Sequence, residues 1–194
     1  MIKKQTYPNY KIETIGISGK KKTGKKEFAV ILQNALEARG VAKPIIKAGF
    51  ADSIYQTLIS LFSPKLTWDH FKNKEELIPG IALPNGDPAN ARRLLQDFGA
   101  MCMCMSPTVW IDRIFKHRLH DYIYIIYDVR LPNEAAAVMS HKGILIRLDS
   151  PVQDEHITET ALDDFKGFDI VLECKTRGEM KDDIQDIVKS MNVY

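Results

Sequence analysis

The stretch 14–26 combines residue types and spacing that suit the binding of a phosphate group. An apolar segment opens it, the pattern Gly-x4-Gly-Lys follows, and an amphipathic segment begins directly after that. Gly19 and Gly24 allow the backbone to curl so that its N–H groups point toward an anion, and the N-terminus of a following helix adds partial positive charge. Lys25 would then reach the β- and γ-phosphates of a nucleotide. The stretch therefore predicts a phosphate-binding loop (P-loop), with a basic turn ahead of a helix as the alternative.

Lysine is concentrated in this loop, where five cations occupy seven consecutive positions. A basic cluster of this kind can bind nucleic acid, but inside a glycine loop it favours a polyphosphate. We therefore predict ATP as the ligand and no nucleic-acid partner. The residues predicted to bind ATP are Gly19, Lys20, Lys22, Thr23, Gly24, Lys25 and Lys26. A P-loop ordinarily has Ser or Thr at the position of Lys26, where the hydroxyl holds Mg²⁺.

A second group of chemically active side chains follows the most apolar segment of the chain, residues 122–127. A segment that is apolar throughout predicts a strand buried on both faces. An Asp at the end of such a strand can hold Mg²⁺ beside a bound nucleotide, so Asp128 is the predicted metal ligand, with a helix cap as the alternative. Arg130, two residues further, would lie on the same side if the strand continues, and its planar fork could grip a second phosphate.

Strand and helix patterns alternate along the chain, which predicts parallel strands joined by helices. Strands are predicted at 14–18, 44–48, 122–127, 143–148 and 169–172, and helices at 27–39, 52–62, 91–101, 108–120, 133–141 and 179–191. Residues 65–90 contain three prolines and two glycines and predict an irregular excursion with at most one helical turn. The predicted fold class is α/β, with three layers around a parallel sheet of about five strands. The candidate ligand residues would lie at the carboxyl ends of those strands.

Length and composition favour a single globular domain, because 194 residues with 45% hydrophobic and 27% charged content are typical of one. No stretch approaches the roughly 20 apolar residues of a membrane span, and residues 1–11 lack the apolar core of a signal peptide. We therefore predict a loosely held N-terminal arm at 1–11, no membrane partner and a cytoplasmic location. Three cysteines fit a reducing compartment. Cys102 and Cys104 are predicted to be buried in a helical core, with a soft-metal site as the alternative.

Six segments, spread over most of the chain, match one kinase family in order. They are SGKKKTGK at 18–25, GFAD at 49–52, RRLLQDFG at 92–99, VWI at 109–111, DVRLPNEA at 128–135 and ETALDD at 159–164. The segment Asp-Val-Arg-Leu-Pro-Asn-Glu after a buried strand is the most specific of them. On these segments the chain resembles the phage deoxynucleoside monophosphate kinase family, and more distantly the animal-type phosphomevalonate kinases.

The resemblance implies a nucleoside monophosphate kinase-like fold in a single domain, 1–194, which transfers a phosphoryl group from ATP to a (deoxy)nucleoside monophosphate. Lys25 would stabilise the transferring group, Asp128 would act on the metal side, and Arg130 would hold the acceptor phosphate. The resemblance places the acceptor in a helical region at about 50–120. The residues of that region predicted to bind it are Asp52, Arg92, Arg93, Gln96 and Trp110. Core packing is the alternative for Trp110, and a solvated helix face is the alternative for the two arginines.

The resemblance also implies a lid at about 149–164 that closes over ATP and excludes water. Arg147 and His156 are the candidate phosphate contacts of that region, and a salt-bridged surface loop is the alternative. Asn133 and Glu134 are expected to cap the helix that follows Arg130 and to orient that arginine.

Four features depart from the pattern of the family. Lys26 replaces Asp, Ser or Thr, and Tyr55 replaces a Lys. The stretch 99–101, Gly-Ala-Met, replaces a polar Gly-Thr-Glu, and Cys104 falls where the family has an Arg. Fewer cationic groups near a transferring phosphoryl group weaken the stabilisation of its transition state. Two alternatives therefore stay open: a nucleotide-binding relative without catalysis, and a kinase of a non-nucleotide phosphate such as phosphomevalonate. A homodimer is an open alternative for the oligomeric state, and a phage-encoded protein would lie in the host cytoplasm.

Overall fold

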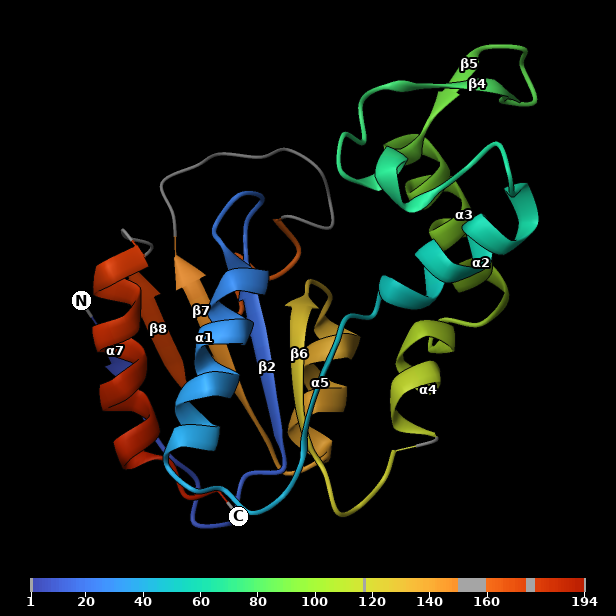
Figure 1. The fold of residues 1–194 in the computed structure, drawn as a ribbon. Coiled ribbons are helices and arrows are strands. Elements are labelled where there is room, and N and C mark those ends of the chain that lie inside the picture. The colour runs from blue at the N-terminus through green and yellow to red at the C-terminus, as the bar shows by residue number, and fades with distance from the viewer. Residues whose placement is uncertain (1, 117, 150–159, 174–176, 194) are drawn as a thin grey trace. The chain divides into compact units, whose positions relative to one another are not determined.

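The computed structural model describes residues 2–116, 118–149, 160–173 and 177–193, which fall into two compact units (Figure 1). The first unit consists of residues 1–49 and 118–194, and the second of residues 50–117. The second unit is therefore inserted between two halves of the first, and the chain passes between the units twice. The insertion spans the stretch that the family resemblance assigns to the acceptor region.

A six-stranded sheet forms the centre of the first unit, with the strand order β1-β8-β7-β2-β6-β3. Its strands are β1 (Ile2–Gln5), β2 (Thr14–Gly19), β3 (Ile45–Ala48), β6 (Ile123–Val129), β7 (Gly143–Asp149) and β8 (Ile170–Glu173). β1 pairs antiparallel with β8, and every other pair in this order is parallel. The carboxyl ends of the parallel strands therefore meet at one edge of the sheet, with the end of β2 between those of β7 and β6.

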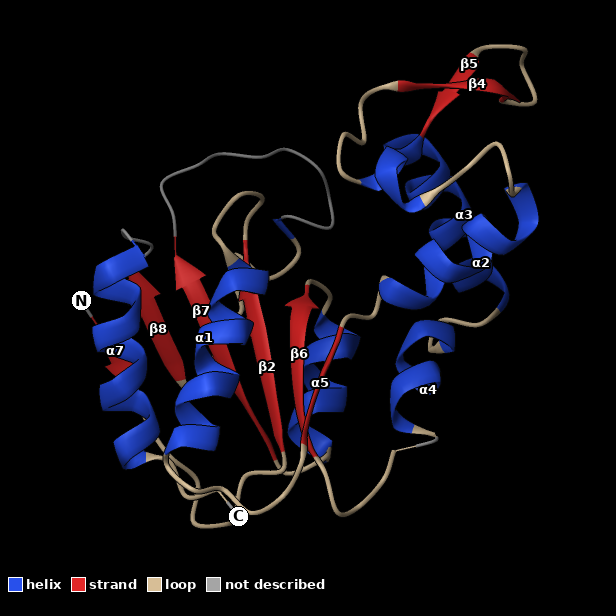
Figure 2. Ribbon diagram, in the orientation of Figure 1, coloured by secondary structure: helices blue, strands red, loops and turns tan. Residues whose placement is uncertain are grey.

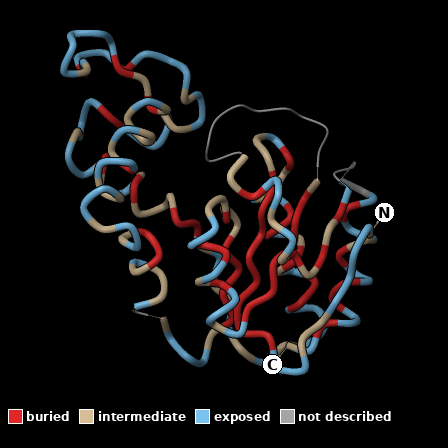
Figure 3. The backbone as a smooth tube through the Cα atoms, turned by 180° about the vertical axis from the view of Figure 1, so that it is seen from behind, coloured by how far each residue is buried: buried red, intermediate tan, exposed pale blue. Residues whose placement is uncertain are grey.

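Helices cover both faces of this sheet (Figure 2). They are α1 (Lys25–Ala38), α5 (Pro132–Ser140) and α7 (Arg177–Ser190). α1 and α7 contact each other and share a core cluster with Ile15, Ile17 and Ile146, whereas α5 contacts β2 and β7 through a separate buried set that includes Val138. All six residues of β2 are buried, as Figure 3 illustrates for the central strands, and successive side chains of a strand point to opposite faces. The first unit is thus an α/β structure with a mostly parallel sheet flanked by helices.

The second unit is mainly helical. Its elements are α2 (Asp52–Phe62), the 3₁₀ helix η1 (Trp68–Phe71), the strands β4 (Leu77–Ala82) and β5 (Pro88–Asn90), α3 (Ala91–Met105) and α4 (Val109–Phe115). β4 and β5 pair antiparallel. The side chain of Asn90 accepts a hydrogen bond of 2.8 Å from the N–H of Arg93 and so caps the first turn of α3. α2 and α3 contact each other, and the rings of Tyr55, Trp68 and Phe71 pack together beside them.

Most predicted elements are confirmed. The strands predicted at 14–18, 44–48, 122–127, 143–148 and 169–172 are β2, β3, β6, β7 and β8, and the helices predicted at 27–39, 52–62, 91–101, 133–141 and 179–191 are α1, α2, α3, α5 and α7. Their apolar patterns are strong and local, so the sequence alone is sufficient to identify them. The coarse fold class, α/β with a mostly parallel sheet, is therefore confirmed.

Two segments predicted to lack strands contain them. The five predicted strands form the parallel part of the sheet, but residues 2–5 of the predicted loose arm add a sixth, the antiparallel edge strand β1. Three of its four residues are exposed, so it lacks the apolar alternation that marks a half-buried strand. The predicted irregular excursion also contains β4 and β5. Their prolines, which normally break a strand, are tolerated because this two-stranded sheet consists of edges only.

Two further predictions are wrong in part. The helix predicted at 108–120 is present as α4, but it ends at Phe115, and beyond it the N–H of Leu119 donates to the hydroxyl of Tyr124 at 3.0 Å. Burial in a helical core is wrong for the two cysteines of α3. Cys102 is half-buried and Cys104 is exposed. Only Ala91 and Gly99 of this helix are fully buried, so its final turn lies at the surface.

Candidate phosphate-binding site

The loop between β2 and α1 is closed by the side chain of Lys25. Its Nζ atom donates hydrogen bonds to the carbonyl oxygens of Gly19 and Lys20, both at 2.6 Å. The buried hydroxyl of Thr23 donates to the Lys20 carbonyl at 2.8 Å. Gly24, the N-cap of α1, has φ 77°, a left-handed conformation that would cost a residue with a Cβ atom about 1–2 kcal/mol. The residues expected in a phosphate-binding loop therefore form one compact turn at the N-terminus of α1.

Lys20 and Arg147 share one carboxylate, that of Asp163. Lys20 Nζ lies 3.0 Å from Asp163 Oδ2, and Arg147 Nη2 lies 2.8 Å from Oδ1. Arg147 Nη1 also donates to the hydroxyl of Ser18 at 3.1 Å. Arg147, predicted to contact phosphate, is thus held by protein partners that link β7 to the start of the loop. Asp163 belongs to a matched segment of the sequence, but nothing in its spacing indicated that it would lie beside the loop.

β6 brings Asp128 to the carboxyl edge of the sheet through a β-bulge. The register between β2 and β6 shifts between Gly16 and Ser18, where two steps along β2 match three along β6. Asp128 lies in the bulged stretch and is half-buried. It packs against the backbone of Gly49, because a Cβ atom there would lie 2.7 Å from Asp128 Oδ2. A side chain at position 49 would therefore displace the carboxylate, which occupies the space that glycine leaves open.

Lys26 lies over the ring of Tyr127, the residue that precedes Asp128, with its Nζ atom 4.9 Å from the ring centroid. A protonated lysine has no lone pair with which to bind a metal, so Lys26 cannot replace the usual hydroxyl ligand. Among the described residues, no group of three or more His, Cys, Asp or Glu side chains could hold a metal ion. Mg²⁺ in nucleotide sites commonly uses only one or two carboxylates, with waters and phosphate oxygens as its other ligands. Asp128 therefore fits Mg²⁺ together with a bound polyphosphate.

Arg130 belongs to the turn between β6 and α5, and the carboxylate of Glu134 fastens this turn. Glu134 Oε2 accepts hydrogen bonds from the N–H groups of Arg130, at 2.7 Å, and Leu131, at 3.0 Å. Burial raises the pKa of Glu134 to about 7; the charge of Asp128 adds to this effect, and the Arg130 N–H opposes it. Glu134 therefore caps the first turn of α5, as predicted. β6 ends at Val129, so strand alternation does not determine the direction of Arg130.

Three of the residues predicted to bind the acceptor lie on α3 of the second unit. Arg92 forms an ion pair with Glu75, and Arg93 Nε lies 2.6 Å from Asp97. Gln96 is half-buried on the same helix. The side chain of Arg93 is 59% exposed and that of Arg92 34% exposed. The surface that these arginines present is therefore partly neutralised by carboxylates.

Trp110 and Asp52, the other two predicted acceptor residues, lie on α4 and α2. Trp110 is 8% exposed, and its Nε1 atom donates to the Gly99 carbonyl at 3.3 Å. This agrees with the alternative of core packing. Tyr55, on α2, stands where the resemblance implies a Lys, and Lys74 Nζ lies 2.6 Å from its hydroxyl. A lysine from another segment thus brings an ammonium group to that position.

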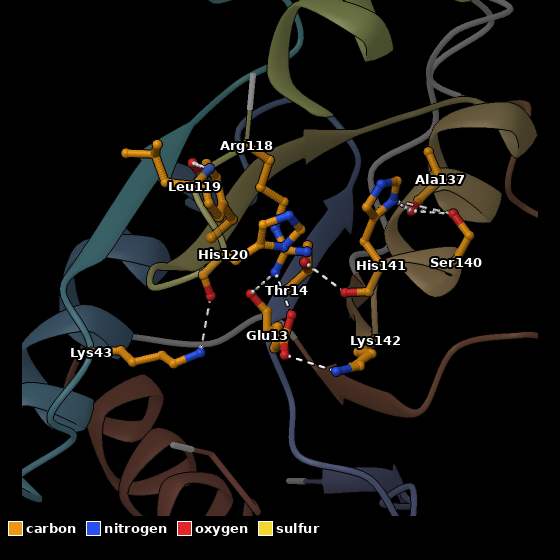
Figure 4. A network of polar contacts seen from close by, with 11 residues as sticks. Glu13, Thr14, Lys43, Arg118, Leu119, His120, Ala137, Ser140, His141 and Lys142 are labelled. Atoms are coloured by element: carbon orange, nitrogen blue, oxygen red, sulfur yellow. Dashed lines mark hydrogen bonds and ion pairs between the residues drawn. The ribbon is translucent and has the colours of Figure 1, made fainter. Parts of the chain in front are cut away.

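A second polar network lies at the opposite end of the parallel strands, just before their amino ends (Figure 4). Glu13, which precedes β2, lies 3.1 Å from Arg118 Nη2 and 3.0 Å from Lys142 Nζ. Burial acts to raise the pKa of Glu13, but the hydrogen bonds from Lys142 and Arg118 outweigh it and hold the pKa below its usual value. The network ties the amino ends of three strands together. It is therefore separate from the candidate site at the carboxyl edge.

Part of the predicted lid, residues 150–159 with His156, lies outside the described residues, as does Cys174. No helix within the described residues is long and apolar enough to cross a membrane. No protein-family model matches the chain, and no curated protein matches it.

Proposed function

We propose that this protein transfers the γ-phosphoryl group of ATP to a (deoxy)nucleoside monophosphate. The observation that carries the proposal is the pairing of β2 with β6. The lysine-closed glycine loop follows β2, and Asp128 and Arg130 lie at the end of β6, so both groups occur at the carboxyl edge of one sheet. Open α/β sheets bind their ligands at this edge. The proposal thus unites the two groups of candidate residues in one reaction.

Each catalytic candidate has a role that follows from its chemistry. Lys25, now bonded to loop carbonyls, would exchange those bonds for oxygens of the transferring phosphoryl group and offset its charge. Arg130 would hold the acceptor phosphate with its planar fork, in line with the γ-phosphate. A bond forms between an acceptor oxygen and the γ-phosphorus, while the bond to the β–γ bridging oxygen breaks. Asp128 would hold Mg²⁺, which supplies further charge neutralisation when bound.

A nucleotide-binding protein without transferase activity is the second candidate. Lys26 favours it, because this residue brings an ammonium group where a P-loop has a metal-binding hydroxyl. Its ammonium group lies over the ring of Tyr127, which directly precedes the candidate metal ligand, Asp128, in the sequence. Binding of ATP without turnover would support this candidate.

The phosphate-binding loop can be tested apart from catalysis by titrating ATP and inorganic tripolyphosphate calorimetrically. Lys25→Ala should lower the affinity for both ligands about tenfold or more, because it removes a charge-assisted contact worth about 1.5–3 kcal/mol. Lys189→Ala is a matched control, since it removes the same charge from a side chain that is 71% exposed on α7. The control should bind both ligands as the wild type does. Equal affinity in wild type and Lys25→Ala would contradict the proposed site.

A further inference from the structure

We infer that Glu134 is a positioning residue for the acceptor phosphate, which acts by holding the backbone of Arg130 in one conformation. The inference rests on the proposed function, in which Arg130 binds that phosphate. Glu134 itself would touch neither substrate. A buried residue on α5 would thus contribute to binding of the acceptor phosphate through the conformation of Arg130.

The geometry of the turn supports the inference. Arg130 and Leu131 are the only residues between β6 and α5, and one oxygen of Glu134 accepts the N–H groups of both. Two bonds to a single atom fix the orientation of two successive peptide groups. The direction in which the Arg130 side chain leaves the backbone is then fixed as well. A bidentate contact with a phosphate requires a defined direction, because both N–H···O bonds must align at once.

The surroundings of Glu134 stabilise its two hydrogen bonds to the backbone. The residue is 8% exposed, so water competes little for its hydrogen bonds. Ala135, the next residue, is fully buried, and α5 packs on β2 and β7. The carboxylate is therefore attached to a helix that is itself anchored on the sheet.

A helix cap without a role in substrate binding would have the same bonds, so the test must separate these two roles. Glu134→Gln keeps a carbonyl oxygen at the same distance from the backbone and can accept both N–H groups. Glu134→Ala removes the oxygen that accepts these two hydrogen bonds. Glu13→Gln is the matched control, because Glu13 is another buried glutamate of the same unit, at the opposite edge of the sheet.

Two measurements are made on the full chain and its three variants. Amide hydrogen exchange should be at least tenfold faster at Arg130 and Leu131 in Glu134→Ala, and close to wild type in Glu134→Gln and Glu13→Gln. In the transfer reaction, Glu134→Ala should raise KM for the monophosphate at least tenfold, with the KM for ATP within twofold of wild type. Glu134→Gln should recover most of the acceptor KM.

The outcomes separate the inference from the proposed function. Faster exchange with an unchanged acceptor KM would leave Glu134 as a helix cap only and overturn the inference. Equal losses for both substrates, or an equal acceptor defect in Glu13→Gln, would attribute the effect to general destabilisation and overturn it too. If the wild type transfers phosphate to no monophosphate, the proposed function fails and the positioning role fails with it.

Discussion

At the residue scale, the chemistry depends on a few side chains that the sequence places at two loops. The spacing of Gly19, Gly24 and Lys25 predicts a turn ahead of a helix, and the structure has such a turn. Contacts between distant segments could not be predicted in the same way. The carboxylate of Asp163 beside Lys20 and the backbone of Gly49 against Asp128 depend on how strands pair, which local spacing does not encode.

Lys26 gives a prediction about the metal. Lys26→Thr provides the hydroxyl that Mg²⁺ lacks in this loop, so the apparent affinity of the ATP complex for Mg²⁺ should rise about tenfold. A metal titration of ATP binding, followed calorimetrically, measures this. Lys21→Thr serves as the control, because it removes a loop lysine that is not among the predicted ATP contacts and leaves the position next to Lys25 unchanged. Identical dependence of ATP binding on Mg²⁺ in wild type and Lys26→Thr would mean that a hydroxyl at position 26 does not contribute to metal binding.

Arg130 gives a prediction about the acceptor. Arg130→Lys keeps the positive charge but loses the planar fork, so one of two phosphate bonds is lost. KM for the monophosphate should rise about tenfold, while ATP binding stays near the wild-type value. Initial rates against monophosphate concentration, together with an ATP titration, separate the two effects. Full retention of acceptor affinity would place the acceptor phosphate elsewhere.

At the element scale, the sequence predicts the elements with strong local patterns and misses those that depend on pairing partners. β2, β6 and β7 are apolar enough to be recognised alone. β1 is polar, and it is a strand because its backbone pairs with that of β8. The bulge in β6 is equally invisible in the sequence, since it is defined by the register against β2. Elements with weak patterns are therefore where the structure adds most.

The first turn of α5 predicts a dependence of stability on pH. The pKa of Glu134 is raised from 4.5 to about 7 in the folded state, so between these values the folded protein binds more protons than the unfolded one. The contribution of Glu134 to stability is thus full below pH 4.5 and is lost as the pH rises through 7. Relative to Glu134→Gln, the wild type should lose on the order of 3 kcal/mol of unfolding free energy across this window.

Urea unfolding of both proteins at several pH values between 4 and 8 measures the difference. Subtracting the two curves removes the contributions of other titrating groups, such as Glu13 and Asp169, which both proteins share. A difference that does not change with pH would show that Glu134 titrates normally in the folded protein.

At the scale of the whole molecule, the chain forms an α/β unit into which a mainly helical unit is inserted. The α/β unit carries the candidate ATP loop with Asp128 and Arg130, and the helical unit carries Asp52, Arg92, Arg93, Gln96 and Trp110. The fold class follows from alternating strand and helix patterns and was predictable. Substrate choice is not, because base preference depends on a few contacts that leave no pattern in the sequence.

The central claim is tested most directly by phosphoryl transfer from ATP with Mg²⁺ to each deoxynucleoside monophosphate, with phosphomevalonate as a non-nucleotide acceptor. The account predicts formation of ADP and a nucleoside diphosphate with at least one base, a loss of about 100-fold or more in Lys25→Ala, and wild-type rates in Lys189→Ala. Transfer to phosphomevalonate alone, or tight ATP binding without transfer to any acceptor, would contradict it.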